Sequence, residues 1–380
     1  MKNPIPLSLY IHIPWCIKKC PYCDFNSHAV QNELPEESYC ETILRDLKQD
    51  LPLAQDRIIQ TIFFGGGTPS LFSPHSIEHI LNGVAGQLAL APNIEITLET
   101  NPGTLEHKNF TDYKHAGINR ISLGAQSFQD DKLIALGRIH RSSETKHALD
   151  RIISADFNSF NIDLIYGLPD QSPTDALYDL ETALAFSPPH LSWYNLTIEP
   201  NTLFHHQKPP LPSDEILFAI EASGKELLLK NDLQQYEISA FSRQNHQCQH
   251  NLNYWQFGDY LGIGAGAHAK ITDLNNPSTI NRYWKTRNPK SYLTPDHPLL
   301  AGSKIIPIAE LPLEFMLNAL RLSDGISVEY FETRTGLPYS TLLPKLMKAE
   351  SEGLLLLTEK TITPTNLGKR FLNDLLLLFH

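Results

Sequence analysis

Three of the five cysteines in this 380-residue chain, Cys16, Cys20 and Cys23, fall inside one window of eight residues. Three sulfurs cannot all pair with one another, so this C-x3-C-x2-C window is not a disulfide framework and indicates a metal site instead. A structural zinc ion would need a fourth ligand, which His12 or His28 could supply only by an unusual geometry. An iron–sulfur cluster held by three thiolates, with a fourth iron open to another ligand, fits the pattern better.

The elements that must position these cysteines follow a regular alternation over the first 200 residues. Short segments rich in β-forming residues are predicted to be strands, at 7–13, 61–64, 94–99, 120–123, 160–165 and 190–196. Segments with helical periodicity lie near 36–50, 74–90, 104–116, 129–137, 143–155 and 173–186. The alternation predicts βαβ units with a parallel sheet, as a partial (β/α)6 barrel or, alternatively, an open doubly wound sheet.

Ligands of such α/β folds bind at the carboxyl ends of the strands. Five consecutive predicted strand ends carry unusual loops rich in Gly, Pro or carboxylates, namely the cysteine loop and 65–69, 99–103, 124–128 and 163–171. Any one of these loops is compatible with ordinary turn chemistry. Together they favour a single ligand site at the mouth of the barrel.

Several residues in these loops suit a polar ligand. The backbone amides of glycines 65–67 suit a carboxylate or amino-acid head group, although a simple glycine turn before a helix near Ser73 is the alternative. Glu99 and Asp163 are single carboxylates on otherwise apolar strands, where ribose hydroxyls or an ammonium group would satisfy them. Arg138 faces either a ligand carboxylate or solvent at a helix end.

The pattern changes beyond residue 200. The expected elements are a Pro-rich linker at 209–212, a helix at 213–231, a strand at 235–239 and a flexible glycine turn at 262–268. The segment 248–255 shows neither the helical nor the strand periodicity of apolar residues. Three helices at 312–321, 328–334 and 340–353, a hairpin at 354–364 and a last helix at 367–378 predict a winged-helix-like module with a packing or lid role. The predicted domains are a barrel at 1–210, a barrel extension at 211–300 and the winged-helix-like module at 301–380.

The net charge of −11 and the absence of a basic tract argue against nucleic acid as a partner. No apolar run is long enough to span a bilayer, and the first residues lack a signal-peptide core. We therefore expect the protein to be cytoplasmic, in a reducing compartment. We expect Cys40 to be a packed or surface thiol without a metal-binding role.

Tyr10, the cysteine loop, 65–69, 99–102 and 139–141 together make the chain resemble the radical S-adenosylmethionine (SAM) enzymes. The resemblance covers essentially the whole chain and is strongest to the oxygen-independent coproporphyrinogen III oxidase family, in particular its heme chaperones. It implies that the three clustered cysteines ligate a [4Fe-4S] cluster, whose fourth iron is chelated by the amino and carboxylate groups of SAM. It also implies SAM contacts at Tyr10, Tyr22, Gly66, Gly67, Thr68, Glu99, Gln126, Arg138 and Asp163.

Two departures argue against oxidase activity. The oxidases carry a further cysteine two positions after the third, where this chain has Phe25. They also have a longer segment before the cluster loop that helps to close over the substrate, whereas fifteen residues precede Cys16 here. The radical decarboxylation of coproporphyrinogen III to protoporphyrinogen IX is therefore the alternative function.

Residues 250–255 match the H-N-x-x-Y-W motif that the resemblance associates with heme. His250 suits an axial iron ligand, and Tyr254 and Trp255 suit stacking on the macrocycle or a role as second ligand. The alternative is that these residues merely pack a loop against the barrel, and Cys248 and His268 are rival ligands.

The function that we expect is heme trafficking. The protein would bind the cluster, SAM and heme, form a cluster-dependent homodimer, and pass heme to acceptor hemoproteins such as membrane-associated respiratory enzymes. A cluster-bearing scaffold without a heme role is the third hypothesis.

Overall fold

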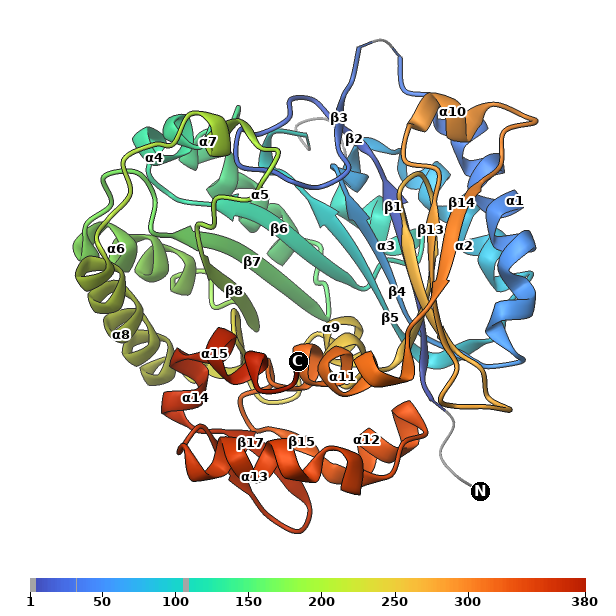
Figure 1. Ribbon diagram of the computed structural model, residues 1–380. Coiled ribbons are helices and arrows are strands. Elements are labelled where there is room, and N and C mark those ends of the chain that lie inside the picture. Colours follow the sequence, from blue (N-terminus) through green and yellow to red (C-terminus); the bar gives the residue numbers. More distant parts are fainter. Residues whose placement is uncertain (1–4, 32, 105–108) are drawn as a thin grey trace.

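The computed structural model describes residues 5–31, 33–104 and 109–380. One strongly curved sheet dominates it, and helices lie along the outside of the curve (Figure 1). In the described part of the chain this sheet has twelve strands, in the order β14-β13-β12-β11-β1-β4-β5-β6-β7-β8-β10-β9. The order β1-β4-β5-β6-β7-β8 follows the chain direction, as consecutive right-handed βαβ units require.

The six predicted strands and the helices between them are confirmed. The strands are β1 (Leu7–Ile13), β4 (Ile59–Gly66), β5 (Leu90–Thr100), β6 (Arg120–Gln126), β7 (Ser159–Tyr166) and β8 (His190–Asn195), all parallel. The helices are α1 (Glu36–Ala54), α2 (Pro74–Ala85), α3 (Phe110–His115), α4 (Asp130–Ala135), α5 (Ser142–Ser154) and α6 (Pro173–Leu184). The first turn of the helix predicted at 104–116 falls partly on 105–108, outside the described residues.

Residues beyond 200 extend the sheet at both edges. After α7 (Leu203–His206) and α8 (Asp214–Lys230), the strands β10 (Ala240–Ser242) and β9 (Gln234–Glu237) pair next to β8. At the other edge β11 (Asp259–Ile263) runs parallel to β1, followed by β12 (His268–Thr272), β13 (Ile280–Lys285), α10 (Pro289–Leu293) and β14 (Leu300–Ile305).

Two local predictions in this region need correction. The glycine turn expected at 262–268 is present but is confined to 264–267, between β11 and β12. Gly262 lies within β11, where a Cβ would come within 1.9 Å of the carbonyl oxygen of His268, so this glycine permits close strand pairing. The segment 248–255, expected to have no regular structure, contains the helix α9 (Gln249–Trp255). This helix lies at the amino-terminal end of the barrel, below the strands in Figure 1.

The central strands bury apolar side chains on their outer face and direct polar ones inward. On β1, Leu9 and Ile11 are fully buried in the core that the outer helices cover, whereas Tyr10 and His12 alternate with them and line an internal cavity. Successive side chains of a strand point to opposite faces, so one segment can supply both the core and the cavity wall. The interior of this barrel is therefore a chamber lined by both polar and aromatic side chains.

The last eighty residues contribute most of a second hydrophobic core, which also includes Phe257 and Ile280. The elements are α11 (Leu311–Ala319), β15 (Ile326–Ser327), α12 (Val328–Thr335), α13 (Leu343–Ser351), β16 (Leu355–Leu357) and β17 (Thr361–Pro364). This is the element order of a winged helix, and the strands pair as β15-β17-β16. The predicted last helix is divided at Phe371 into α14 (Asn366–Arg370) and α15 (Leu372–Leu377). Within the described ranges, no helix is long and apolar enough to cross a membrane.

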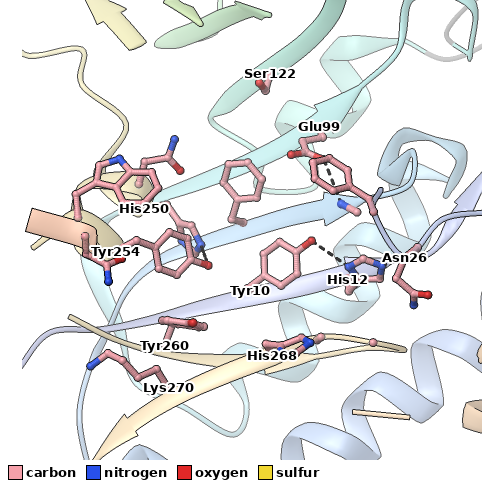
Figure 2. Close-up of a pocket in the computed structure, with 18 of the residues that line it drawn as sticks. Tyr10, His12, Asn26, Glu99, Ser122, His250, Tyr254, Tyr260, His268 and Lys270 are labelled. Carbon is pink, nitrogen blue, oxygen red and sulfur yellow. Dashed lines mark hydrogen bonds between the residues drawn. The ribbon is translucent and has the colours of Figure 1, made fainter. Parts of the chain in front are cut away.

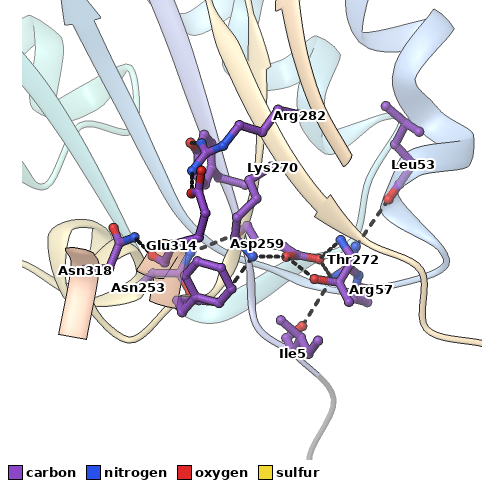
Figure 3. A network of polar contacts seen from close by, with 12 residues as sticks. Ile5, Leu53, Arg57, Asn253, Asp259, Lys270, Thr272, Arg282, Glu314 and Asn318 are labelled. Carbon is purple, nitrogen blue, oxygen red and sulfur yellow. Dashed lines mark hydrogen bonds and ion pairs between the residues drawn. The ribbon is translucent and has the colours of Figure 1, made fainter. Parts of the chain in front are cut away.

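A buried carboxylate joins several elements at the amino-terminal end of the barrel (Figure 3). Asp259 is fully buried and forms ion pairs of 2.7 Å with Arg57 and 2.8 Å with Lys270. It also accepts hydrogen bonds of 2.8 Å from the amide and the hydroxyl of Thr272. Burial alone would raise the pKa of Asp259, but the charges of Lys270 and Arg57 lower it below its ordinary value. The backbone carbonyl of Asp259 binds Asn253 of α9 at 2.8 Å.

Asp259→Asn should destabilise the protein strongly, because it leaves two buried cations without their counter-ion. The free energy of unfolding is expected to fall by about 3–5 kcal/mol, measured by chemical denaturation. Glu226→Gln is the matched control, because its ion pair with Lys230 is two-thirds exposed and should matter little. An Asp259→Asn protein as stable as the wild type would contradict this role.

Candidate functional site

The cysteine loop begins at the carboxyl end of β1 and is held in place at both ends. Its flanks form two short parallel strands, β2 (Trp15–Cys16) and β3 (His28–Ala29). The side-chain amide of Asn26 donates hydrogen bonds of 2.9 Å to the carbonyls of Ala265 and Arg287, which fixes the loop against the β11–β12 turn. These contacts position the loop at the carboxyl end of β1.

All three cysteines line one cavity of about 630 Å³ at the carboxyl ends of the strands. Each sulfur has a polar neighbour at hydrogen-bonding distance: the Thr68 hydroxyl donates to Cys16 at 3.5 Å, Arg138 donates to Cys20 at 3.6 Å, and Ser27 lies 3.7 Å from Cys23. Such contacts are typical of the outer shell around thiolate-bound metals. Burial raises the pKa of Cys16 and Cys23, so metal binding would have to displace their protons.

The two histidines that could complete a zinc site have other partners in this structure. His12 uses both ring nitrogens, at 3.0 Å from the Tyr10 hydroxyl and 2.9 Å from the Asn26 carbonyl, and His28 contacts the Asn26 side chain. Over the residues that the structure describes, no three His, Cys, Asp or Glu side chains converge closely enough to hold one metal ion. Three thiols spread around a common cavity instead suit a cluster of several irons.

Two carboxyl groups face the same cavity. Glu99 accepts a 3.1 Å hydrogen bond from the Gly66 amide, and burial together with the negative charge of Asp163 raises the pKa of Glu99 to about 8. Asp163 accepts hydrogen bonds from Ser122 at 3.1 Å and Asn161 at 2.7 Å, and burial raises its pKa too. Carboxyls enclosed in this way suit ligand hydroxyl or ammonium groups, which would stabilise their charged form.

The glycine loop differs from our expectation. The amides of Gly66, Gly67 and Thr68 are already bound, to Glu99, to the Ile13 carbonyl at 2.8 Å and to the Trp15 carbonyl at 2.7 Å. The amides of Gly66 and Gly67 are therefore not free donors in this arrangement, and the predicted contact of this loop with a ligand carboxylate stays a prediction. Glycine is needed for close packing instead: a Cβ on Gly67 would lie 2.5 Å from the Trp15 carbonyl oxygen. The helix expected near Ser73 is confirmed as α2.

Arg138 points into the site and not to solvent. Its guanidinium donates to the Gly124 carbonyl at 2.8 Å and to Asn101, besides the contact with Cys20. Of the nine SAM contacts expected from the resemblance, seven line the cysteine cavity: Tyr22, Gly66, Gly67, Glu99, Gln126, Arg138 and Asp163. The other two do not. Tyr10 lines an adjoining cavity, and Thr68 lies behind Cys16.

The adjoining cavity is larger, about 950 Å³, and occupies the interior of the barrel (Figure 2). It shares wall residues with the cysteine cavity, among them Phe25, Glu99 and Asp163. From there it extends to α9, which contributes His250, Tyr254 and Trp255 to its wall. The cysteine loop and the 250–255 motif thus face two adjacent chambers that share part of their wall.

His250 is buried, and both of its ring nitrogens are engaged. Nδ1 lies 2.7 Å from the hydroxyl of Thr61, which itself donates to Ser8 at 2.8 Å, so Nδ1 carries the proton. Nε2 is then the acceptor for the Tyr254 hydroxyl, 2.9 Å away. Burial lowers the pKa of His250 to about 3, which keeps the ring neutral. A neutral imidazole with a lone pair on Nε2 is the form that binds metals, but here a tyrosine hydroxyl covers it.

One functional residue that our sequence analysis missed, Glu95 on β5, positions this helix. Its carboxylate accepts hydrogen bonds from the amides of Gln249 at 3.1 Å and His250 at 3.0 Å, and lies 3.6 Å from the Cys248 sulfur. The spacing along the strand could have revealed this role. Glu95 and Glu99 are four residues apart on β5, so both side chains point to its inner face.

The rival heme ligands differ in position. Cys248 is fully buried, is not part of the wall of either large cavity, and has a pKa raised to about 12 by burial. His268 lines the larger cavity and is exposed. Trp255 stacks on Arg321, whose guanidinium carbon lies 4.2 Å from the ring centre.

The model of the radical SAM superfamily matches residues 10–182, and that of the HemN C-terminal domain matches residues 307–371. The chain is 48% identical to the heme chaperone HemW of Escherichia coli over 374 residues, which cover 98% of both chains. It is 31% identical to the heme chaperone HemW of Bacillus subtilis over 379 residues, 97% of both chains.

Among solved structures, the coproporphyrinogen III oxidase HemN of E. coli, a radical SAM enzyme, matches with a TM-score of 0.82. The match covers 99% of this chain and 90% of that chain at 22% identity, so it bears on the fold alone. It confirms the predicted α/β fold class. The chain therefore belongs to the radical SAM superfamily and, within it, to the HemW family of heme chaperones.

Proposed function

We propose that this protein is a heme chaperone that holds a [4Fe-4S] cluster and SAM in the cysteine cavity and heme in the larger one. The observation that carries the proposal is that the two cavities adjoin and share the wall residues Phe25, Glu99 and Asp163, with a neutral histidine on the wall of the larger one. The names of the full-length relatives support the same function. The acceptors would be hemoproteins such as respiratory enzymes.

In the cysteine cavity, Cys16, Cys20 and Cys23 would ligate three irons, and the fourth iron would take the amino and carboxylate groups of SAM. When bound, the cluster supplies an electron to SAM. The hydrogen bond from Arg138 to Cys20 would stabilise the thiolate form of that ligand. Glu99 and Asp163 would accept hydrogen bonds from the ammonium or ribose hydroxyls of SAM, with Tyr22, Gly66, Gly67 and Gln126 completing the wall.

In the larger cavity, Nε2 of His250 would bind the heme iron once the Tyr254 hydroxyl has moved away. Thr61 would keep accepting the proton on Nδ1, which holds the ring in the ligating tautomer and orientation. Tyr254 and Trp255 would then pack against the macrocycle. We place the protein in the cytoplasm, because reduced thiols are needed to receive iron, and we propose a cluster-dependent homodimer as its assembly.

Replacing any one of the three loop cysteines, for example Cys20→Ser, should abolish stable cluster binding. We expect iron and acid-labile sulfide to fall to background after anaerobic reconstitution, together with the broad visible absorbance of the cluster. Cys40→Ser is the matched control, since Cys40 is buried beside the Ser76 carbonyl, outside the cavity wall. Full iron content in the loop variants would exclude this site.

Two substitutions at the heme site should have opposite effects. His250→Ala removes the proposed ligand and should weaken heme binding by about tenfold or more, with the iron content of the cluster unchanged. Tyr254→Phe removes the hydroxyl that competes for Nε2 and should strengthen binding. Both are measured by heme titration followed by absorbance. Unchanged heme affinity in His250→Ala would exclude His250 as an iron ligand. Weaker heme binding in Tyr254→Phe would indicate that the Tyr254 hydroxyl binds the iron instead.

The oxidase alternative is tested directly. The reconstituted, SAM-bound protein with a low-potential reductant and coproporphyrinogen III should form no protoporphyrinogen IX, because Phe25 stands where the oxidases carry a cysteine. Product and 5′-deoxyadenosine are measured by chromatography under anaerobic conditions. Product formation over many turnovers would replace the chaperone proposal with the oxidase.

A further inference from the structure

A buried cation on the wall of the larger cavity has no role in the proposal above. Arg120 begins β6, is 3% exposed and lines the interior chamber, opposite the outer helices. Ser122 and Asn161, inward-facing neighbours on β6 and β7, line the chamber with it. Arg120 therefore lies within the barrel and not at its rim.

The guanidinium of Arg120 makes no hydrogen bond and no ion pair with any residue in the described part of the chain, and its Nε is buried without a partner. This is costly, because a guanidinium carries five N–H donors and a fixed charge. Other cations on the same wall are neutralised: Lys270 by Asp259, and Lys285 by Asp46 at 2.6 Å. Arg120 is thus a cation of this chamber without a bonded counter-ion.

The carboxylates near Arg120 do not act as its bonded counter-ion. The nearby carboxylate of Glu95 interacts electrostatically with the guanidinium but is bonded to the first amides of α9. Asp163 is bonded to Ser122 and Asn161. Burial would lower the pKa of Arg120, but electrostatic interactions with its neighbours, among them Cys248, Glu95 and Asp163, raise it above its ordinary value, so the side chain stays cationic.

Arg120 and His250 belong to one chamber. Both line it, and Glu95 connects them, since it lies near the guanidinium and binds the backbone amide of His250. The charge of Arg120 also contributes to lowering the pKa of His250. A ligand in this chamber could therefore contact the imidazole of His250 and the guanidinium N–H groups of Arg120 at the same time.

We propose that Arg120 binds a carboxylate inside the barrel, namely a propionate group of the heme whose iron binds His250. The inference rests on the proposed heme function and assigns the orientation of the cargo. A guanidinium binds a carboxylate through two parallel hydrogen bonds, and heme carries two propionates on one edge. One propionate would satisfy the buried donors of Arg120 and fix that edge of the macrocycle, while the iron lies toward α9.

The experiment compares heme with its dimethyl ester, which has the same iron and ring but no carboxylate. Both are titrated into the cluster-loaded wild type, Arg120→Gln and Arg287→Gln. Arg287 is the matched control, because it lines the same cavity but is exposed. The wild type and Arg287→Gln should prefer free-acid heme by about tenfold or more, and Arg120→Gln should lose that preference. SAM affinity should be unchanged, which separates heme propionate from the carboxylate of SAM.

Each contrary outcome has a distinct meaning. Equal affinity of the wild type for heme and ester overturns the inference even if Arg120→Gln does not fold. Equal loss of preference in both arginine variants also overturns it, because general electrostatic attraction would then explain the preference. Loss of SAM affinity in Arg120→Gln would assign the guanidinium to SAM. A wild type that binds neither heme nor ester refutes the proposed function itself.

Discussion

The polar inner face of the central strands is the constraint on which the rest of this structure depends. Leu9 and Ile11 of β1 are buried under the outer helices, while the inner face presents Tyr10, His12 and their polar counterparts on the neighbouring strands. Such side chains cannot pack into a dry core without partners. The sheet therefore encloses a chamber, and each polar group on its wall must be satisfied by a neighbour or by a ligand.

This chamber needs closure at both ends, and the chain provides it from distant segments. At the carboxyl ends of the strands the cysteine loop closes the opening, held by the contacts of Asn26 with residues 265 and 287. At the amino-terminal ends α9 forms the floor, fixed by Glu95 from inside the barrel and by the carbonyl of Asp259 below. The cysteine loop and His250 thus lie at opposite ends of the barrel interior, on the walls of two adjoining cavities.

The sequence allowed the central strands and the residues at their carboxyl ends to be predicted, because alternation and loop composition are local signals. Glu99 and Asp163 were found in this way, whereas Arg138, which follows α4, was left open between a ligand and solvent. The role of Glu95 was missed, because its partners are 154 and 155 residues away. The helix α9 was missed for a related reason: its seven residues depend on these tertiary contacts and not on their own periodicity.

The hydroxyl of Tyr254 on Nε2 of His250 has a consequence for the rate at which a ligand leaves. A group that is tethered four residues away on the same helix is present at high effective concentration, so it would return to the nitrogen whenever a ligand leaves it. In the proposed heme complex, this competition would lower the equilibrium affinity of Nε2 for iron and make heme binding more reversible, which is what a carrier requires.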